Sequence, residues 1–208
     1  MNDIEAIMRM APVIPVLVID DVAHAVPIAQ ALVAGGLPVL EVTLRTPCAL
    51  DAIAAMKRVS GAVVGAGTVL NEADLTASIA AGAEFIVSPG LTAPLGKAAV
   101  ASGIPFLPGT ASAGDVMRGL DLGLTRFKFF PAEASGGIAA LKAIAAPFGM
   151  VKFCPTGGIT LASAPDWLAV GAVLCVGGSW MVPKGAPDPA GIEAAARAAA
   201  AFSAEHAA

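Results

Sequence analysis

Short apolar, often β-branched segments alternate with alanine-rich segments along almost the whole chain. Short runs rich in valine and isoleucine between Gly and Pro residues are typical of buried strands, whereas alanine has the highest intrinsic helix propensity. The predicted strands cover residues 13–19, 39–44, 63–65, 85–88, 104–107, 125–129, 151–153 and 173–176. The predicted helices cover residues 22–34, 47–58, 72–81, 92–101, 112–121, 136–146, 161–169 and 189–203, and a short polar helix at 2–9 precedes the first strand.

This order of elements predicts an α/β fold in a single domain, 1–208. Strands that alternate with helices at a spacing of roughly 20–25 residues form a parallel sheet with helices outside it. Eight such units close a (β/α)8 TIM barrel, and about 200 residues is the lower end of the size range of that fold. The alternative is a doubly wound open sheet, but no G-x-G-x-x-G motif opens the first helix. We therefore predict a compact TIM barrel with a short N-terminal helix.

Composition and charge exclude several classes of protein. Hydrophobic residues make up 57% of the 208 residues and charged residues 13%, so the chain can bury a large core and is not disordered. The net charge of −4 and the absence of a basic run argue against nucleic-acid binding. Apolar stretches are interrupted well before the roughly 18 residues that a membrane span needs, and the N-terminus lacks the pattern of a signal peptide.

The cysteines and histidines indicate a cytoplasmic protein without a metal site of its own. Cys48, Cys154 and Cys175 are far apart and lack C-x-x-C spacing, which is typical of buried thiols in a reducing compartment. His24 and His206 belong to no cluster of Asp, Glu or His with the spacing of metal ligands.

Lys128 stands among phenylalanines at the end of the sixth predicted strand. Strand alternation sends Lys128 to one face and Phe127 and Phe129 to the other. Apolar surroundings favour the neutral amine, which is the form that attacks a carbonyl group to make a Schiff base. The alternative is a lysine whose stem packs at the strand end while its ammonium group reaches water.

Catalytic groups of TIM barrels lie at the carboxyl ends of the strands, and the second predicted strand ends in three polar residues that share a face. Glu41 could act as a general base whose proton affinity is tuned by burial against the neighbouring cation. The planar guanidinium of Arg45 suits a substrate carboxylate. The alternative is that Glu41 and Arg45 form a structural ion pair at the rim.

Other strand ends carry glycines, which allow the backbone to approach a ligand closely. The third strand runs into Gly65-Ala66-Gly67-Thr68, and the fourth ends in Ser88-Pro89-Gly90. Two loops with Gly-Gly pairs follow strands seven and eight: Pro155-Thr156-Gly157-Gly158 and Gly177-Gly178-Ser179. TIM barrels often bind phosphate in these two loops through backbone N–H groups, so we predict a phosphate site there. The alternative is a pair of ordinary turns before helices.

Several motifs resemble those of one family in the same order along nearly the whole chain: Glu41-Val42-Thr43-Leu44-Arg45-Thr46, Val64-Gly65-Ala66-Gly67-Thr68-Val69-Leu70, Ser88-Pro89-Gly90, Lys128-Phe129-Phe130-Pro131-Ala132-Glu133, Cys154-Pro155-Thr156-Gly157-Gly158-Ile159 and Gly177-Gly178-Ser179-Trp180. The family is the bacterial 2-keto-3-deoxy-6-phosphogluconate (KDPG) aldolase family, often also active as 4-hydroxy-2-oxoglutarate (KHG) aldolase. The resemblance implies a class I aldolase on a (β/α)8 barrel that is cytosolic, homotrimeric and free of metal and cofactor.

The resemblance also implies roles for matching residues. Lys128 becomes the imine-forming lysine and Glu41 the proton-transfer carboxylate. The residues that contact the pyruvyl part become Arg45, Thr68 and Pro89. The residues at the phosphate end become Thr156, Gly157, Gly158, Gly178 and Ser179. The chain departs from the usual Thr and Glu after Pro108-Gly109, where it reads Ser112 and Asp115. Both changes keep the chemistry needed for a helix cap.

The implied reaction is cleavage of 2-dehydro-3-deoxy-6-phosphogluconate to pyruvate and D-glyceraldehyde 3-phosphate, a step of the Entner–Doudoroff pathway. Cleavage of 4-hydroxy-2-oxoglutarate to pyruvate and glyoxylate is expected beside it. One alternative is an aldolase for the C4-epimeric substrate derived from galactonate. A phosphosugar isomerase or epimerase would use the same phosphate loops without an imine, and a non-catalytic phosphosugar-binding barrel would show affinity without turnover.

Overall fold

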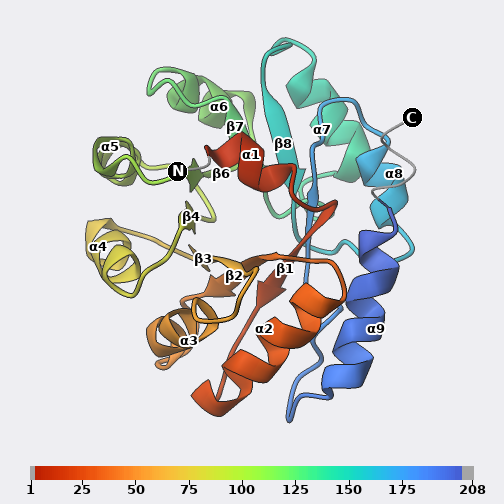
Figure 1. The fold of residues 1–208 in the computed structure, drawn as a ribbon. Coiled ribbons are helices and arrows are strands. Elements are labelled where there is room, and N and C mark those ends of the chain that lie inside the picture. The colour runs from red at the N-terminus through yellow and green to blue at the C-terminus, as the bar shows by residue number, and fades with distance from the viewer. Residues whose placement is uncertain (1–2, 203–208) are drawn as a thin grey trace.

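A computed structural model describes residues 3–202 of the chain as an α/β fold built on parallel strands (Figure 1). One sheet has six strands in the order β5-β4-β3-β2-β1-β9, and a second has three in the order β6-β7-β8. Every strand pair in the two sheets is parallel. The strands are β1 (Val13–Leu17), β2 (Val39–Thr43), β3 (Val63–Gly67), β4 (Phe85–Val87), β5 (Phe106–Leu107), β6 (Gly109–Thr110), β7 (Arg126–Phe129), β8 (Lys152–Pro155) and β9 (Val176–Gly178).

Two short links connect the sheets. Between β5 and β6 stands only Pro108, which has no N–H group to donate to a ladder. On the other side, isolated parallel bridges join Phe153 to Val173 and Thr156 to Gly177. The parallel sheet therefore curls, with β7 facing β2 across its concave side, where a hydrogen bond joins Lys128 of β7 to Glu41 of β2.

Most helices follow a strand and lie outside the sheets, whereas α1 precedes β1 (Figure 1). They are α1 (Ile4–Met8), the 3-10 helix η1 (Val22–His24), α2 (Ala25–Ala34), α3 (Ala49–Met56), α4 (Glu72–Ala80), α5 (Ala93–Ser102), α6 (Ala113–Leu120), α7 (Gly137–Ala145), α8 (Ala164–Leu168) and α9 (Pro189–Ala200). Helix α6 begins with the expected cap, since Ser112 and Asp115 form a reciprocal capping box. Within residues 3–202, no helix is long and apolar enough to cross a membrane.

Most of the predicted elements are present, with one correction. The eighth strand was expected to end at Val176, but β9 begins there and includes Gly177 and Gly178. Gly177 pairs with Ile14 and Gly178 with Pro15 of β1, so this glycine pair belongs to the sheet and not to a loop. The predicted N-terminal helix is α1, whose expected first residue lies outside the described residues, as do the last residues expected for the final helix.

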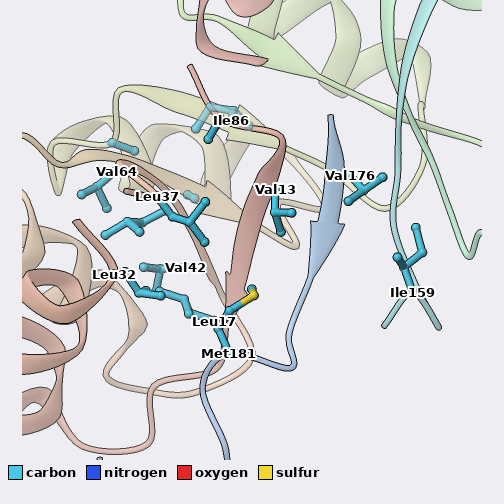
Figure 2. Close-up of a cluster of buried hydrophobic side chains, with 14 of the residues drawn as sticks. Val13, Leu17, Leu32, Leu37, Val42, Val64, Ile86, Ile159, Val176 and Met181 are labelled. Atoms are coloured by element: carbon cyan, nitrogen blue, oxygen red, sulfur yellow. The ribbon is translucent and has the colours of Figure 1, made fainter. Parts of the chain in front are cut away.

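Buried side chains form two clusters on opposite faces of the strands. The larger cluster packs between strands and outer helices, and Figure 2 shows part of it around Val13, Leu17 and Val42. The smaller cluster, here called the inner cluster, fills the concave face and consists of Ile7, Met8, Ile14, Val39, Phe85, Val87, Leu107, Cys154 and Cys175. Helix α1 supplies the first two of these, and Glu5 of α1 forms an ion pair with Arg126 of β7. The N-terminal helix therefore closes the amino ends of the strands.

Candidate active site

A buried ion pair links β7 and β2 at the centre of the concave face. Lys128 Nζ donates to Glu41 Oε1 at 2.9 Å and to Oε2 at 3.3 Å. Lys128 is 5% exposed and Glu41 3%. Phe127 and Phe129 lie in the larger cluster behind β7, which confirms the predicted alternation. A buried carboxylate within hydrogen-bond distance of an amine can exchange a proton with it, which is the chemistry that imine formation requires.

Gly67 of β3 makes room for the Glu41 side chain. A methyl group on Gly67 would lie 2.3 Å from Glu41 Oε1 and 2.7 Å from its Cγ. Carbon and oxygen atoms do not approach that closely, so the carboxylate can lie over β3 only because residue 67 has no side chain. The expected role of Gly67 was to let the backbone approach a ligand, whereas here it accommodates the Glu41 carboxylate.

The partner expected for Glu41 was Arg45, and the structure corrects this. Among the ion pairs of residues 3–202, Glu41 pairs with Lys128 and none joins it to Arg45. Arg45 lies in the turn after β2 and is exposed. Thr43, between them, is buried and donates to the carbonyl oxygen of Leu17 at 2.8 Å, so its hydroxyl has a structural role.

Two thiols lie beneath the ion pair. Cys154 of β8 is the register partner of Lys128, and Cys175 belongs to the same inner cluster. A hydrogen bond to the Cys154 thiol raises the pKa of Cys175 well above its usual range, and burial and the nearby Glu41 carboxylate act in the same direction. Cys175 therefore stays protonated, as expected for a buried cysteine without a reactive role.

A cavity of about 710 Å³ opens at the carboxyl ends of β1, β8 and β9. Six of the predicted substrate-binding residues line it: Arg45, Thr156, Gly157, Gly158, Gly178 and Ser179. Lys128 adjoins it, because its ammonium group lies 5.3 Å from the centroid of the Phe130 ring, and Phe130 is part of the wall. A ligand in this cavity could therefore extend from the buried ion pair toward the glycine loops.

The loops after β8 and β9 are held side by side. Gly157 and Gly158 have φ values of 106° and 85°, a region that favours glycine. The turn after β7 fixes the first loop, since the N–H of Ala132 donates to Thr156 O at 2.8 Å and that of Glu133 to Gly157 O at 3.1 Å. A methyl group on Gly177 would lie 2.2 Å from Thr156 Oγ1, so the glycine lets Thr156 pack against β9.

Thr68 and Pro89, the remaining predicted contacts, are not among the residues that line this cavity. Thr68 follows β3 and is half-buried with a φ of 61°, a conformation rare for a β-branched residue. Such strain is often found at ligand-binding positions. Pro89 follows β4, and its carbonyl oxygen lies so close to Gly109 of β6 that a methyl group there would be 2.1 Å away.

Among the charged and aromatic residues of the cavity wall, the sequence interpretation did not assign Phe130, Asp20, His24 and Lys184 to the site. Asp20 and His24 follow β1, and Lys184 lies in the segment between β9 and α9. Their position after the carboxyl end of a strand was the available signal. The sequence interpretation considered the Gly-Gly pairs in these loops and did not consider these charged and aromatic side chains.

Comparison with known proteins agrees with this arrangement. The sequence pattern of the aldolase family described as KDPG and KHG aldolase matches residues 4–195. The KHG/KDPG aldolase of Escherichia coli K12 is 58% identical over 183 residues, which cover 88% of this chain and 86% of that protein. The crystal structure of the 2-keto-3-deoxy-6-phosphogluconate aldolase of Zymomonas mobilis ZM4 with 3-phosphoglycerate matches with a TM-score of 0.95 and 66% identity over 96% of each chain.

A third similar protein is the KDPG aldolase of Legionella pneumophila, whose crystal structure holds pyruvate captured as a covalent carbinolamine intermediate. It matches with a TM-score of 0.92 and 45% identity over 96% of this chain and 98% of that one. A family match across most of the chain, with relatives this similar over nearly their full length, leaves one assignment: the chain belongs to the KDPG and KHG aldolase family.

Proposed function

We propose that the protein is a class I aldolase that cleaves 2-dehydro-3-deoxy-6-phosphogluconate to pyruvate and D-glyceraldehyde 3-phosphate. The observation that carries the proposal is the buried Lys128–Glu41 pair, 2.9 Å apart at the end of a strand and beside a cavity. The names of the relatives support the same substrate, and the covalent pyruvate adduct of the Legionella enzyme supports the same chemistry. Cleavage of 4-hydroxy-2-oxoglutarate is a second expected activity, because the E. coli relative is named for both substrates.

The reaction begins when Lys128 gives its extra proton to Glu41 and the neutral amine attacks the C2 ketone. Glu41 returns that proton to the hydroxyl group of the carbinolamine, which leaves as water and gives an iminium ion. The positive nitrogen withdraws electrons as the C3–C4 bond breaks. Glu41 accepts the proton of the C4 hydroxyl group, so the aldehyde leaves and an enamine of pyruvate remains on Lys128. Glu41 then returns the proton to C3, and water hydrolyses the iminium to release pyruvate and the free amine. Glu41 is 3% exposed, which keeps competing water away from this proton transfer.

The remaining site residues orient the substrate in this proposal. The guanidinium of Arg45 binds the carboxylate of the pyruvyl part, and Thr68 and Pro89 contact the same part from the ends of β3 and β4. The loop at Thr156–Gly158 and the end of β9 at Gly178–Ser179 bind the phosphate group through backbone N–H groups and the Ser179 hydroxyl. Support comes from the cavity wall, which contains both segments and Arg45.

We also propose that the two sheets form one closed (β/α)8 barrel. In this description β5 and β6 are a single strand interrupted by Pro108, and the bridges at Phe153–Val173 and Thr156–Gly177 close the sheet between β8 and β9. The homotrimer and the cytoplasmic location expected from the sequence stay predictions. Sedimentation at micromolar protein concentration tests the trimer, and a monomer there would contradict it.

Borohydride reduction in the presence of pyruvate tests the mechanism directly. Peptide mapping by mass spectrometry should locate the reduced pyruvyl group on Lys128. Lys152→Arg is the control, because Lys152 lies at the amino end of β8, opposite to the end that carries the site, and donates to Gly171 O at 2.7 Å. That variant should be labelled like the wild type.

A label on Lys152 or Lys57 would overturn the assignment, and no label at all would favour an isomerase, an epimerase or a binding protein. Turnover of the two C4-epimeric substrates then separates the gluconate-derived from the galactonate-derived substrate. The gluconate-derived epimer should be the faster one.

A further inference from the structure

The phosphate end of the proposed site is built from uncharged groups. Gly157, Gly158, Gly178 and Ser179 offer N–H and hydroxyl donors but no positive charge. A phosphate monoester carries a charge of about −1.5 to −2 at neutral pH. Charge-assisted hydrogen bonds are roughly twice as strong as neutral ones, so a cation close to these loops would add strongly to phosphate binding.

The cavity wall supplies three basic side chains within the described residues: Arg45, His24 and Lys184. Arg45 follows β2, and β1 separates that strand from β9 in the sheet. His24 is the last residue of η1, the 3-10 helix that follows β1. Lys184 lies in the same segment as Ser179, between β9 and α9, so it is the basic residue that the chain connects most directly to the phosphate end.

From this arrangement we infer that Lys184 binds the substrate phosphate and sets the preference for phosphorylated substrates. The inference rests on the proposed function and extends it. Lys184 is exposed, and among the ion pairs of residues 3–202 none occupies its ammonium group. A flexible lysine on a loop at the edge of the cavity can close onto a ligand as it binds.

The negative charge of Asp20 is a second reason for a cation at this position. It is exposed, lines the same cavity and follows β1, the strand that pairs with β9. Its carboxylate repels an incoming phosphate, and Lys184 offsets that repulsion. 4-Hydroxy-2-oxoglutarate ends in a carboxylate whose carbon is three atoms closer to the reacting carbon than the phosphorus is, so it gains less from a cation at the far end of the cavity.

The test compares Lys184→Gln with wild type on both substrates. We expect kcat/KM for the phosphorylated substrate to fall about 10-fold, mainly through KM, because one charge-assisted contact is lost at a solvent-exposed position. The loss on 4-hydroxy-2-oxoglutarate should be smaller. Lys184→Arg should recover most of the activity. Lys97→Gln, which removes an exposed lysine from the outer helix α5, is the control for net charge.

Ionic strength provides a second readout. An exposed cation–phosphate attraction is screened by salt, so raising salt from 0.05 to about 0.5 M should lower wild-type kcat/KM for the phosphorylated substrate more than that of Lys184→Gln. Equal losses on both substrates, or a variant with wild-type selectivity and salt dependence, would overturn the inference. Wild-type protein that fails to cleave the phosphorylated substrate at all would instead overturn the proposed function, and borohydride trapping of pyruvate distinguishes the two failures.

Discussion

Gly67→Ala tests whether Glu41 must lie where it does. The added methyl group would be 2.3 Å from Glu41 Oε1 and 2.8 Å from Cδ, whereas non-bonded contacts need about 3.4 Å or more. The carboxylate therefore has to retreat by about 1 Å, and the 2.9 Å bond to Lys128 lengthens beyond hydrogen-bond distance. A misplacement of that size can cost about 100-fold in rate, equivalent to about 2.7 kcal/mol of transition-state stabilisation.

The assay is steady-state cleavage together with exchange of pyruvate methyl protons in deuterated water, which reports the proton transfer at C3 alone. Both should fall by about the same factor. Overpacking also destabilises the fold by about 1–3 kcal/mol, so a matched control is needed. Gly65→Ala in the same strand provides it, because the atoms nearest to its methyl group would be those of the Phe85 ring, at 2.5 Å. Thermal unfolding should show both variants destabilised.

The reasoning fails if Gly67→Ala cleaves substrate at the rate of Gly65→Ala while both remain folded. That result would mean that Glu41 moves without consequence and that another group transfers the proton.

Three further predictions address other contacts. Glu41→Gln should slow cleavage and methyl proton exchange by roughly 10²–10⁴-fold while pyruvate can still be reduced onto Lys128; exchange at the wild-type rate would make Glu41 a structural partner only. Ser179→Ala should cost about 1.5–3 kcal/mol in transition-state binding of the phosphorylated substrate, and equal losses with 4-hydroxy-2-oxoglutarate would contradict a phosphate contact. The ion pair with Arg126 lowers the pKa of Glu5 below its ordinary value of 4.5, so its contribution to stability, about 0.5 kcal/mol, is complete above that pH and is lost as pH falls through the folded pKa. Urea unfolding of Glu5→Gln should therefore differ from wild type at pH 7 and converge with it as the pH falls below 4.5 and through the folded pKa, and a gap that does not narrow over that range would count against the ion pair.

The order of strands and the position of Lys128 could be predicted because both depend on local patterns. Once β7 is known to be a strand, the two-residue alternation of side chains places Lys128 on the face opposite to that of its neighbours in the sequence. The apolar runs were long enough to identify every strand except β6 at Gly109–Thr110, although the strand ends shifted by a few residues. The capping box of Ser112 and Asp115 was also readable, since it involves residues three apart.

Contacts between strands that are far apart in the sequence could not be predicted from local patterns. Glu41 and Lys128 are 87 positions apart, and their meeting depends on how far the sheet curls. Local alternation offered Arg45 as the nearest cation, but the chain turns after Thr43 and carries Arg45 to the edge of the cavity. Gly177 and Gly178 were taken for a loop because glycine disfavours strands. They lie in β9 because Thr156 and the Trp180 ring occupy the space where side chains would project.

The reactivity of the thiols below the active site can be used to measure local unfolding of the chain. Alkylating reagents need a thiolate that solvent can reach, and Cys154 and Cys175 are 2% and 0% exposed. Labelling of either one therefore requires β8 or the segment before β9 to separate transiently from its neighbours, so the alkylation rate measures how often that happens. Half-buried Cys48, at the start of α3, supplies an internal reference for reagent activity. Comparing these rates with and without pyruvate would show how much covalent occupation of Lys128 suppresses such openings.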